Sequence, residues 1–277
     1  MRIRLIALAT LCGAALATVP ADHGDLLPVT AGRQFLAFDT TGDGTAVEVV
    51  GHLPTARRIT VLVPGTDHTL ATFDRGLGGF THRAPAVQAR VLYGAAHRRE
   101  PRTAVIAWLG YDAPEGFGPS ALRSDRARAG AVELVRFLAE VCRQQPDATV
   151  VVVGHSYGAL VTGRAAADLA DCVTDLVALG APGMGASHVD ELATGARVWS
   201  ATADGDWISW VPQVRLAGFG HGTSPADPSF GARPLPAERV DGHDGYLRPG
   251  SDTLNALADL VTADPDRSGT QAISVAR

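Results

Sequence analysis

A short stretch around Ser156 has the residue types and the spacing of a nucleophile site. Four valines, Val150–Val153, lead into Gly154-His155-Ser156-Tyr157-Gly158, and a segment rich in small residues follows. The valine run predicts a buried strand and the next segment predicts a helix, so Ser156 lies in a sharp turn between them. Such a turn strains the serine backbone and pushes its hydroxyl outward. A serine that only caps a helix would not require both glycines, so the pattern indicates a nucleophile.

A nucleophilic serine needs a base to take its proton and a carboxylate to orient that base. The apolar run at residues 196–201 is followed by the acid-rich loop Asp204-Gly205-Asp206. We favour Asp206 as the orienting acid because Asp-x-Ile leads into the next element. Asp204 remains the alternative, and the acid that does not serve is expected to form a turn or a helix cap.

The base is expected near the end of the chain, after the acid. Of the nine histidines, only His221 and His243 follow Asp206. His243 is favoured because it follows a predicted last strand, Glu238–Val240, and precedes the final helix. His221 is then expected to line the pocket. His155 lies inside the turn, and we expect its side chain to point away from the serine.

Two backbone N–H groups are placed to stabilise a developing oxyanion. The N–H of Tyr157 lies at the start of the predicted helix, where N–H groups are free and the helix dipole is positive. The second donor is expected from the turn after the apolar run Ile59–Val63. Gly65 opens that turn, and Thr66 is positioned to offer its N–H.

The surrounding pattern predicts the elements that hold these groups. Residues 33–50 alternate around Gly-Asp-Gly and predict a β-hairpin. Short, solidly apolar runs predict strands buried on both faces, at residues 59–63, 104–109, 150–153, 173–179 and 196–201. Amphipathic segments at 124–144 and 251–263 predict helices. Strands alternating with helices indicate an α/β fold with a mostly parallel sheet, which binds ligands at the carboxyl ends of its strands.

Length and charge limit the function classes. The chain has 277 residues and a net charge of −5, which favours one domain and gives no basic stripe for a nucleic-acid partner. All 24 basic residues are arginine. Without lysine, the chain has no Lys Schiff base, no Ser–Lys dyad and no P-loop lysine.

The first 21 residues predict a secretory signal peptide. Arg2 and Arg4 precede a short apolar run, and small-residue cleavage sites follow. We therefore expect a secreted or cell-envelope protein with a single domain over residues 22–277 and no stable membrane insertion. Cys142 and Cys172 lie at the predicted N-terminal edges of neighbouring strands. They form either a disulfide or two buried thiols.

With GHSYG, Asp206 and His243 in this order, the chain resembles the α/β-hydrolase superfamily. The pieces VPGT, FDRGLGGF, YDAP and LGAPG are similar to a bacterial branch catalogued as a domain of unknown function. The resemblance covers roughly residues 33 to 262. It implies a sheet of about eight strands, a serine-triad hydrolase without cofactor or metal, and FDRGLGGF as a loop beside the oxyanion turn. The superfamily often has histidine before the oxyanion glycine, where this chain has Pro64.

Taken together, the sequence predicts a serine hydrolase that cleaves carboxylic esters through an acyl-enzyme. Its partner is expected to be a small-molecule ester or acyl substrate. The same groups also suit amide cleavage or acyl transfer, and a binding module that lost activity is the alternative from another class. No large lid domain is expected. Aromatic residues in the loops are expected to form an apolar pocket rim: Tyr111, Phe117, Trp207, Trp210, Phe219 and Phe230.

Overall fold

The computed structural model describes residues 32–116, 119–211, 213 and 220–264. The strands in this part are β1 (Gln34–Asp39), β2 (Thr45–Gly51), β3 (Arg58–Val63), β4 (Thr103–Leu109), β5 (Thr149–His155), β6 (Val173–Leu179), β7 (Arg197–Ala201) and β8 (Arg233–Pro234). The α-helices are α1 (Pro85–His97), α2 (Pro119–Leu122), α3 (Asp125–Gln144), α4 (Tyr157–Ala165) and α5 (Asp252–Thr262). Short 3₁₀ turns fill several of the connections.

Within the described residues, the strands form one eight-stranded sheet in the order β1-β2-β4-β3-β5-β6-β7-β8. The hairpin of β1 and β2 is antiparallel, and β2 also pairs antiparallel with β4. The strands from β4 to β8 pair in parallel. The predicted hairpin and the predicted mostly parallel sheet are therefore confirmed.

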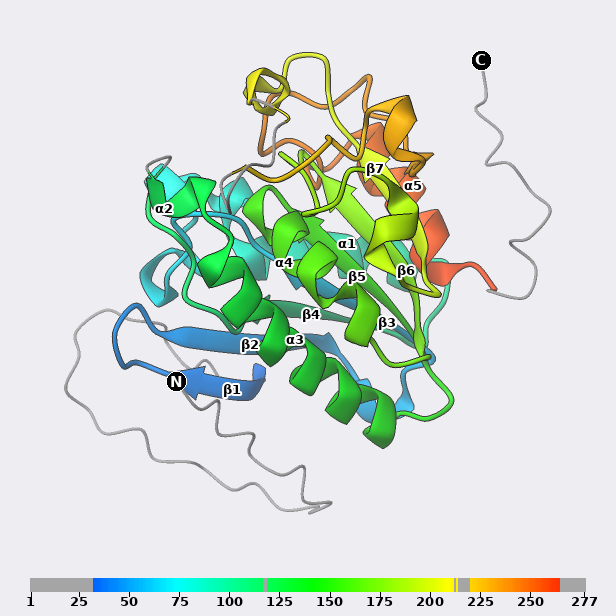
Figure 1. Ribbon diagram of the computed structural model, residues 1–277. Coiled ribbons are helices and arrows are strands. Elements are labelled where there is room, and N and C mark those ends of the chain that lie inside the picture. Colours follow the sequence, from blue (N-terminus) through cyan, green and yellow to red (C-terminus); the bar gives the residue numbers. More distant parts are fainter. Residues whose placement is uncertain (1–31, 117–118, 212, 214–219, 265–277) are drawn as a thin grey trace.

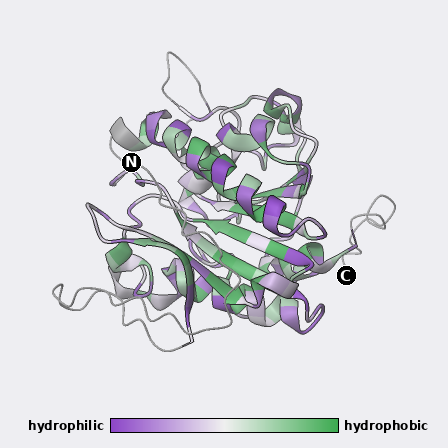
Figure 2. Ribbon diagram, turned by 90° about the horizontal axis from the view of Figure 1, so that it is seen from below, coloured by the Kyte–Doolittle hydropathy of each residue, from purple (hydrophilic) through white to green (hydrophobic). Residues whose placement is uncertain are grey.

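Helices cover both faces of this sheet (Figure 1). α3 and α4 pack on one face, and α1 and α5 pack on the other. The central strand β4 is buried along its whole length, as an apolar strand between two helical layers must be. Hydrophobic residues concentrate in the strands and hydrophilic ones on the outer sides of the helices (Figure 2). The described residues contain no separate lid domain above the sheet.

The sequence patterns also located the two long amphipathic helices. In α3, Ala127, Ala131, Leu134, Leu138 and Val141 recur at spacings of three and four, and all are buried. α5 begins after Ser251, whose hydroxyl accepts the N–H of Leu254 at 3.1 Å. These helices pack on opposite faces of the sheet. The sheet in turn positions the loops at the carboxyl ends of its strands.

The predicted last strand is wrong. Residues 238–240 do not extend the sheet, because Glu238 and Arg239 form a turn. The last strand is instead the two-residue β8, in which Arg233 and Pro234 pair with β7. Proline has no N–H to donate to a ladder, which limits how far this edge can continue.

A disulfide joins Cys142, near the end of α3, to Cys172, just before β6. Of the two possibilities left by the sequence, the structure therefore has the disulfide. It lies at the amino edge of the parallel strands, the edge opposite to Ser156. The predicted signal segment, residues 1–21, lies outside the described residues. Among the helices that are described, none combines the length and the apolar character needed to span a membrane.

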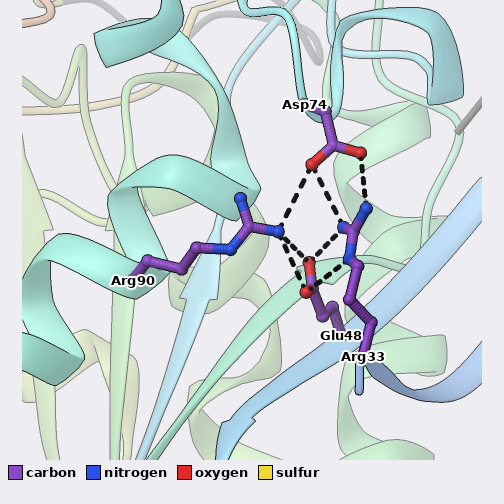
Figure 3. A network of polar contacts seen from close by, with 4 residues as sticks. All are labelled: Arg33, Glu48, Asp74 and Arg90. Carbon is purple, nitrogen blue, oxygen red and sulfur yellow. Dashed lines mark hydrogen bonds and ion pairs between the residues drawn. The ribbon is translucent and has the colours of Figure 1, made fainter. Parts of the chain in front are cut away.

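Four charged side chains join the hairpin to helix α1 and to the loop that follows β3 (Figure 3). Glu48 on β2 is 2% exposed and accepts hydrogen bonds from Arg33 at 2.5 Å and 2.8 Å. Arg90 on α1 contacts the same carboxylate at 3.0 Å. Asp74, in the loop, accepts from Arg33 at 2.9 Å. This four-charge network ties the start of the loop at residues 74–80 to the sheet.

Replacing Glu48 with glutamine should destabilise the fold by about 2–3 kcal/mol, because it leaves two arginines facing a neutral amide in a buried site. The figure is below that for a fully buried pair, because Arg90 is partly exposed and Asp74 remains as a partner. Urea unfolding followed by circular dichroism measures the change. Glu140→Gln breaks the exposed Arg143–Glu140 pair on α3 and is the matched control, for which no shift in midpoint is expected. Equal midpoints for the two variants would contradict a role of the network in stability.

Candidate functional site

Ser156 occupies the turn between β5 and α4. Its backbone has φ 54° and ψ −125°, a conformation that non-glycine residues rarely adopt, so the expected strain is present. A Cβ on Gly154 would lie 2.6 Å from the backbone of Ala159, and one on Gly158 would lie 2.2 Å from the carbonyl oxygen of Val63. The two glycines are required because strand and helix approach this closely.

The turn after β3 lies directly beside Ser156. A Cβ on Gly65 would lie 2.8 Å from the Ser156 Cβ and 3.3 Å from its Oγ. Thr66 follows in the same turn and is buried. Tyr157 is the first residue of α4, where backbone N–H groups have no partner within the helix. The N–H groups of Thr66 and Tyr157 therefore come from the two elements that flank the serine.

The structure brings His243 and Asp206 together. His243 Nδ1 lies 2.8 Å from Asp206 Oδ1 and 3.0 Å from Oδ2. Asp206 is 2% exposed, and its Oδ1 also accepts the N–H of Ile208 at 2.9 Å, which fixes the carboxylate at the start of a 3₁₀ turn. Asp204, the alternative acid, is exposed on the preceding turn. The contact to the histidine is therefore made by Asp206.

Tyr246 is a member of this cluster that had no assigned role in the sequence analysis. Its hydroxyl donates to Asp206 Oδ2 at 2.5 Å and accepts the N–H of Ala203 at 3.0 Å. Gly180, at the end of β6, makes room for the contact, because a Cβ there would lie 2.8 Å from Asp206 Oδ2 and 3.2 Å from His243 Nδ1.

These contacts set the ionisation of the cluster. Burial acts to raise the pKa of Asp206, but the hydrogen bonds from His243, Tyr246 and Ile208 outweigh it and lower the pKa below its ordinary value. Burial, and then the bond to the Asp206 carboxylate, raise the pKa of Tyr246 far above its ordinary value. At neutral pH the cluster therefore holds an ionised carboxylate and a neutral phenol that donates to it.

His155 lies against His243, which leaves untested the expectation that its side chain points away from Ser156. Its ring lies 4.8 Å from the ring of His243, and its Nε2–H donates to the His243 carbonyl oxygen at 2.7 Å. Burial, and then the proximity of His243, lower the pKa of His155 to about 4. A neutral imidazole therefore supports the backbone and the ring of His243.

A cavity of about 430 Å³ opens above these groups. Its lining residues are Gly65, Thr66, Asp67, His68, Leu77, Gly78, Arg83, His155, Ser156, Trp207, His243 and Asp244. Leu77 and Gly78 belong to FDRGLGGF, so this loop lies beside the turn after β3 as expected. Ser156 and His243 line one cavity. Across the described residues, the hydrogen bonds of the His243 ring go to Asp206 and none joins it to the serine hydroxyl.

The expected apolar rim is largely wrong. Of the aromatic residues proposed for it, Trp207 does line the cavity, with its ring 4.6 Å from that of His243. Tyr111 and Phe230 are buried in the core, and Trp210 is 86% exposed. Phe117 and Phe219 lie outside the described residues. The loop aromatics were misread because the sequence does not reveal which face of a loop turns inward.

His221 does not line the cavity. It is buried, and its ring packs edge-on against Tyr157 at 5.8 Å between centroids. Burial lowers its pKa. Within the described ranges, no cluster of three or more histidine, cysteine or acidic side chains is suited to hold a metal ion.

Comparisons with known proteins identify the family of the chain. A family model described as "Alpha/beta hydrolase" matches residues 39–216. An uncharacterised Mycobacterium tuberculosis protein is 32% identical over 255 residues, covering 81% of this chain and 38% of the relative. An uncharacterised Mycobacterium bovis protein is 32% identical over 181 residues, covering 61% of this chain and 64% of that protein. This chain thus spans less than two thirds of the length of either relative.

Solved structures with a similar fold include two with esterase or hydrolase descriptions. A Xanthomonas campestris protein described as an α/β serine hydrolase without lid has 18% identity and a TM-score of 0.45, covering 86% of this chain and 94% of that one. Esterase PE8 has 16% identity and a TM-score of 0.49, covering 77% of this chain and 95% of that one.

Proposed function

Because the chain belongs to the α/β-hydrolase family, we propose that it is a serine hydrolase that cleaves carboxylic esters through an acyl-enzyme. One observation carries the proposal. Ser156, held in a strained turn, lines the same cavity as His243, and a buried carboxylate, Asp206, is bonded to that imidazole. This is the set of groups that a nucleophilic serine requires.

In the proposed reaction, the Ser156 hydroxyl attacks the ester carbonyl while His243 Nε2 takes its proton. Asp206 holds the ring with Nδ1–H directed at its carboxylate, so that Nε2 is free to act as the base, and it stabilises the imidazolium that forms. The serine–imidazole contact forms as substrate closes the site, since such contacts are often long in free enzymes.

We assign the stabilisation of the negative charge that develops on the carbonyl oxygen to two backbone N–H groups, those of Tyr157 and Thr66. Their positions support this assignment. Tyr157 begins the helix after the serine, and Thr66 follows Gly65, which lies against the serine. His243 then returns its proton to the leaving alcohol. Water then attacks the acyl carbon while His243 takes a proton from it, and as the ester bond to Ser156 breaks, His243 gives that proton to the serine oxygen and the acid leaves.

A fluorophosphonate probe tests this proposal directly. Fluorophosphonates react with activated serines by loss of fluoride, so incubation of the folded protein should add the mass of one probe less HF, and peptide mass spectrometry should locate the adduct on Ser156. Prior denaturation is the control, because it removes the base and should abolish labelling. A folded protein that stays unlabelled, and that hydrolyses no p-nitrophenyl ester from acetate to octanoate, would favour the binding-module alternative.

We also propose that the protein acts outside the cytoplasm. The support is the signal-like composition of residues 1–21 together with the disulfide between Cys142 and Cys172. Disulfides persist mainly in oxidising compartments. Fractionation of the producing cells, with the protein detected by antibody, measures the location.

A further inference from the structure

The cavity above Ser156 presents polar and apolar atoms in similar amounts, so it is less apolar than a rim of aromatic side chains would make it. Only two of its lining side chains, Leu77 and Trp207, are apolar. A cavity built for a long alkyl chain is lined mainly by hydrophobic side chains. The lining side chains therefore help to decide which ester the cavity binds. This question rests on the proposed function.

The charged groups of the lining already have partners inside the protein. Asp67 accepts the N–H of Gly116 at 2.6 Å. Arg83 lies 2.9 Å from Asp244, so these two opposite charges neutralise each other at the wall. The positive charge of Arg83 is thereby compensated, which argues against an anionic ligand group, whereas the Gly116 N–H gives Asp67 a hydrogen bond without a counter-charge.

The turn after β3 adds two uncharged polar side chains to the wall, Thr66 and His68. His68 is 6% exposed, and its polar contact within the described residues is a long one, 3.5 Å from Nδ1 to Thr72 Oγ1. Thr72 Oγ1 accepts the N–H of Thr69 and donates to the Thr69 carbonyl, so its remaining lone pair can only accept, which suits a proton on His68 Nδ1. Since Nδ1 faces Thr72 and His68 lines the cavity, we assign the Nε2 edge of the ring to the cavity.

Burial, and then the proximity of His155, lower the pKa of His68 to about 3. His68 is therefore uncharged at any pH at which the enzyme would work. A neutral imidazole and a threonine hydroxyl can each donate or accept a hydrogen bond, and an alcohol is a small uncharged group that satisfies both kinds of partner. A methyl group in the same place would leave them unpaired in a buried wall.

We propose that His68, with Thr66, is the specificity-determining contact of this cavity and binds a hydroxyl group of the substrate. The preferred substrate is then a short ester that carries an uncharged hydroxyl close to the scissile carbonyl, in its acyl or its alcohol part. His68 acts in recognition and moves no proton of the reaction.

Two isosteric ester pairs test the proposal. The first pair is p-nitrophenyl glycolate and p-nitrophenyl propionate, whose acyl groups end in a hydroxyl and a methyl group respectively. The second pair is 2-hydroxyethyl butyrate and propyl butyrate, whose alcohol parts differ in the same way. After correction for spontaneous hydrolysis, the wild type should favour the hydroxylated member of at least one pair by about tenfold in kcat/KM, the scale of one well-made hydrogen bond.

The variants then assign the preference. His68→Phe should lower kcat/KM about tenfold for the favoured hydroxylated ester, mainly through KM, and change its apolar partner less than twofold. His68→Gln keeps a polar group near Nε2 and should retain most of the preference. His97→Phe is the matched control, because His97 is a partly buried histidine that stacks on Tyr93 in α1, away from the cavity. This variant should leave the preference for the hydroxylated ester unchanged.

Two results would overturn the inference: a wild type without hydroxyl preference, or a His68→Phe variant that slows both members of a pair equally. If His68→Phe does not fold, Thr66→Val, which keeps its backbone N–H, should reduce the preference about threefold or more. Failure of this inference is distinguishable from failure of the function. Probe labelling on Ser156 without any hydroxyl preference rejects only the inference, whereas absence of labelling and hydrolysis rejects both.

Discussion

Replacing Ser156 with alanine should lower kcat for ester hydrolysis by about 10⁶-fold, and replacing His243 with alanine should cost about the same. The two groups act as one unit, because the hydroxyl is a weak nucleophile without the imidazole and the imidazole has no proton to take without the hydroxyl. The double variant should therefore be no slower than either single variant. Initial rates with p-nitrophenyl acetate at high enzyme concentration measure all three.

His221→Ala is the control for His243→Ala, since His221 is the other histidine that follows Asp206 in the chain. It packs against the Tyr157 ring outside the cavity, so a loss of no more than severalfold is expected. Circular dichroism must show that each variant is folded. Losses that multiply in the double variant, or a larger loss for His221→Ala, would mean that Ser156 and His243 do not act together.

Replacing Asp206 with asparagine should lower kcat/KM by about 10⁴-fold at neutral pH. The carboxylate now accepts from His243 Nδ1–H, which leaves Nε2 free as the base. An asparagine NH₂ would donate to Nδ1 instead, shift the ring proton to Nε2 and block proton transfer from Ser156. The Tyr246 hydroxyl and the Ile208 N–H also donate to this side chain, and an amide has one oxygen for them instead of two.

Asp204→Asn is the matched control for this prediction. It removes an equal charge two residues away, but Asp204 is exposed, so less than a twofold change in kcat/KM is expected. Rates for both variants with the same ester make the comparison. Similar losses would mean that negative charge near His243 matters more than orientation of the ring, and the assigned role of Asp206 would be wrong.

Periodicity and turn chemistry in the sequence predicted most of what positions the site. The valine run of β5 and the two flanking glycines predicted the strained turn at Ser156, because only a close approach of strand and helix requires both glycines. The 3-and-4 spacing predicted α3 to within one residue at its start. Such signals are local, and a single sequence contains them in full.

Contacts between distant loops were not predictable in this way. The hydrogen bond from Tyr246 to Asp206 joins residues 40 positions apart, and the packing of His155 on His243 joins residues 88 apart. The position of the last strand also failed, because β8 is two residues long and contains a proline, too short for a periodic pattern. These features depend on how loops fold over the sheet edge, which no local pattern records.

The disulfide between Cys142 and Cys172 closes one edge of the sheet, and the cavity opens at the other. The disulfide is thus separated from Ser156 and His243 by the length of the parallel strands. Substitutions or insertions in the loops around Ser156 leave the edge that carries the disulfide unchanged. The loops that shape the cavity of this chain can therefore vary at one end of the molecule without altering the cross-linked end.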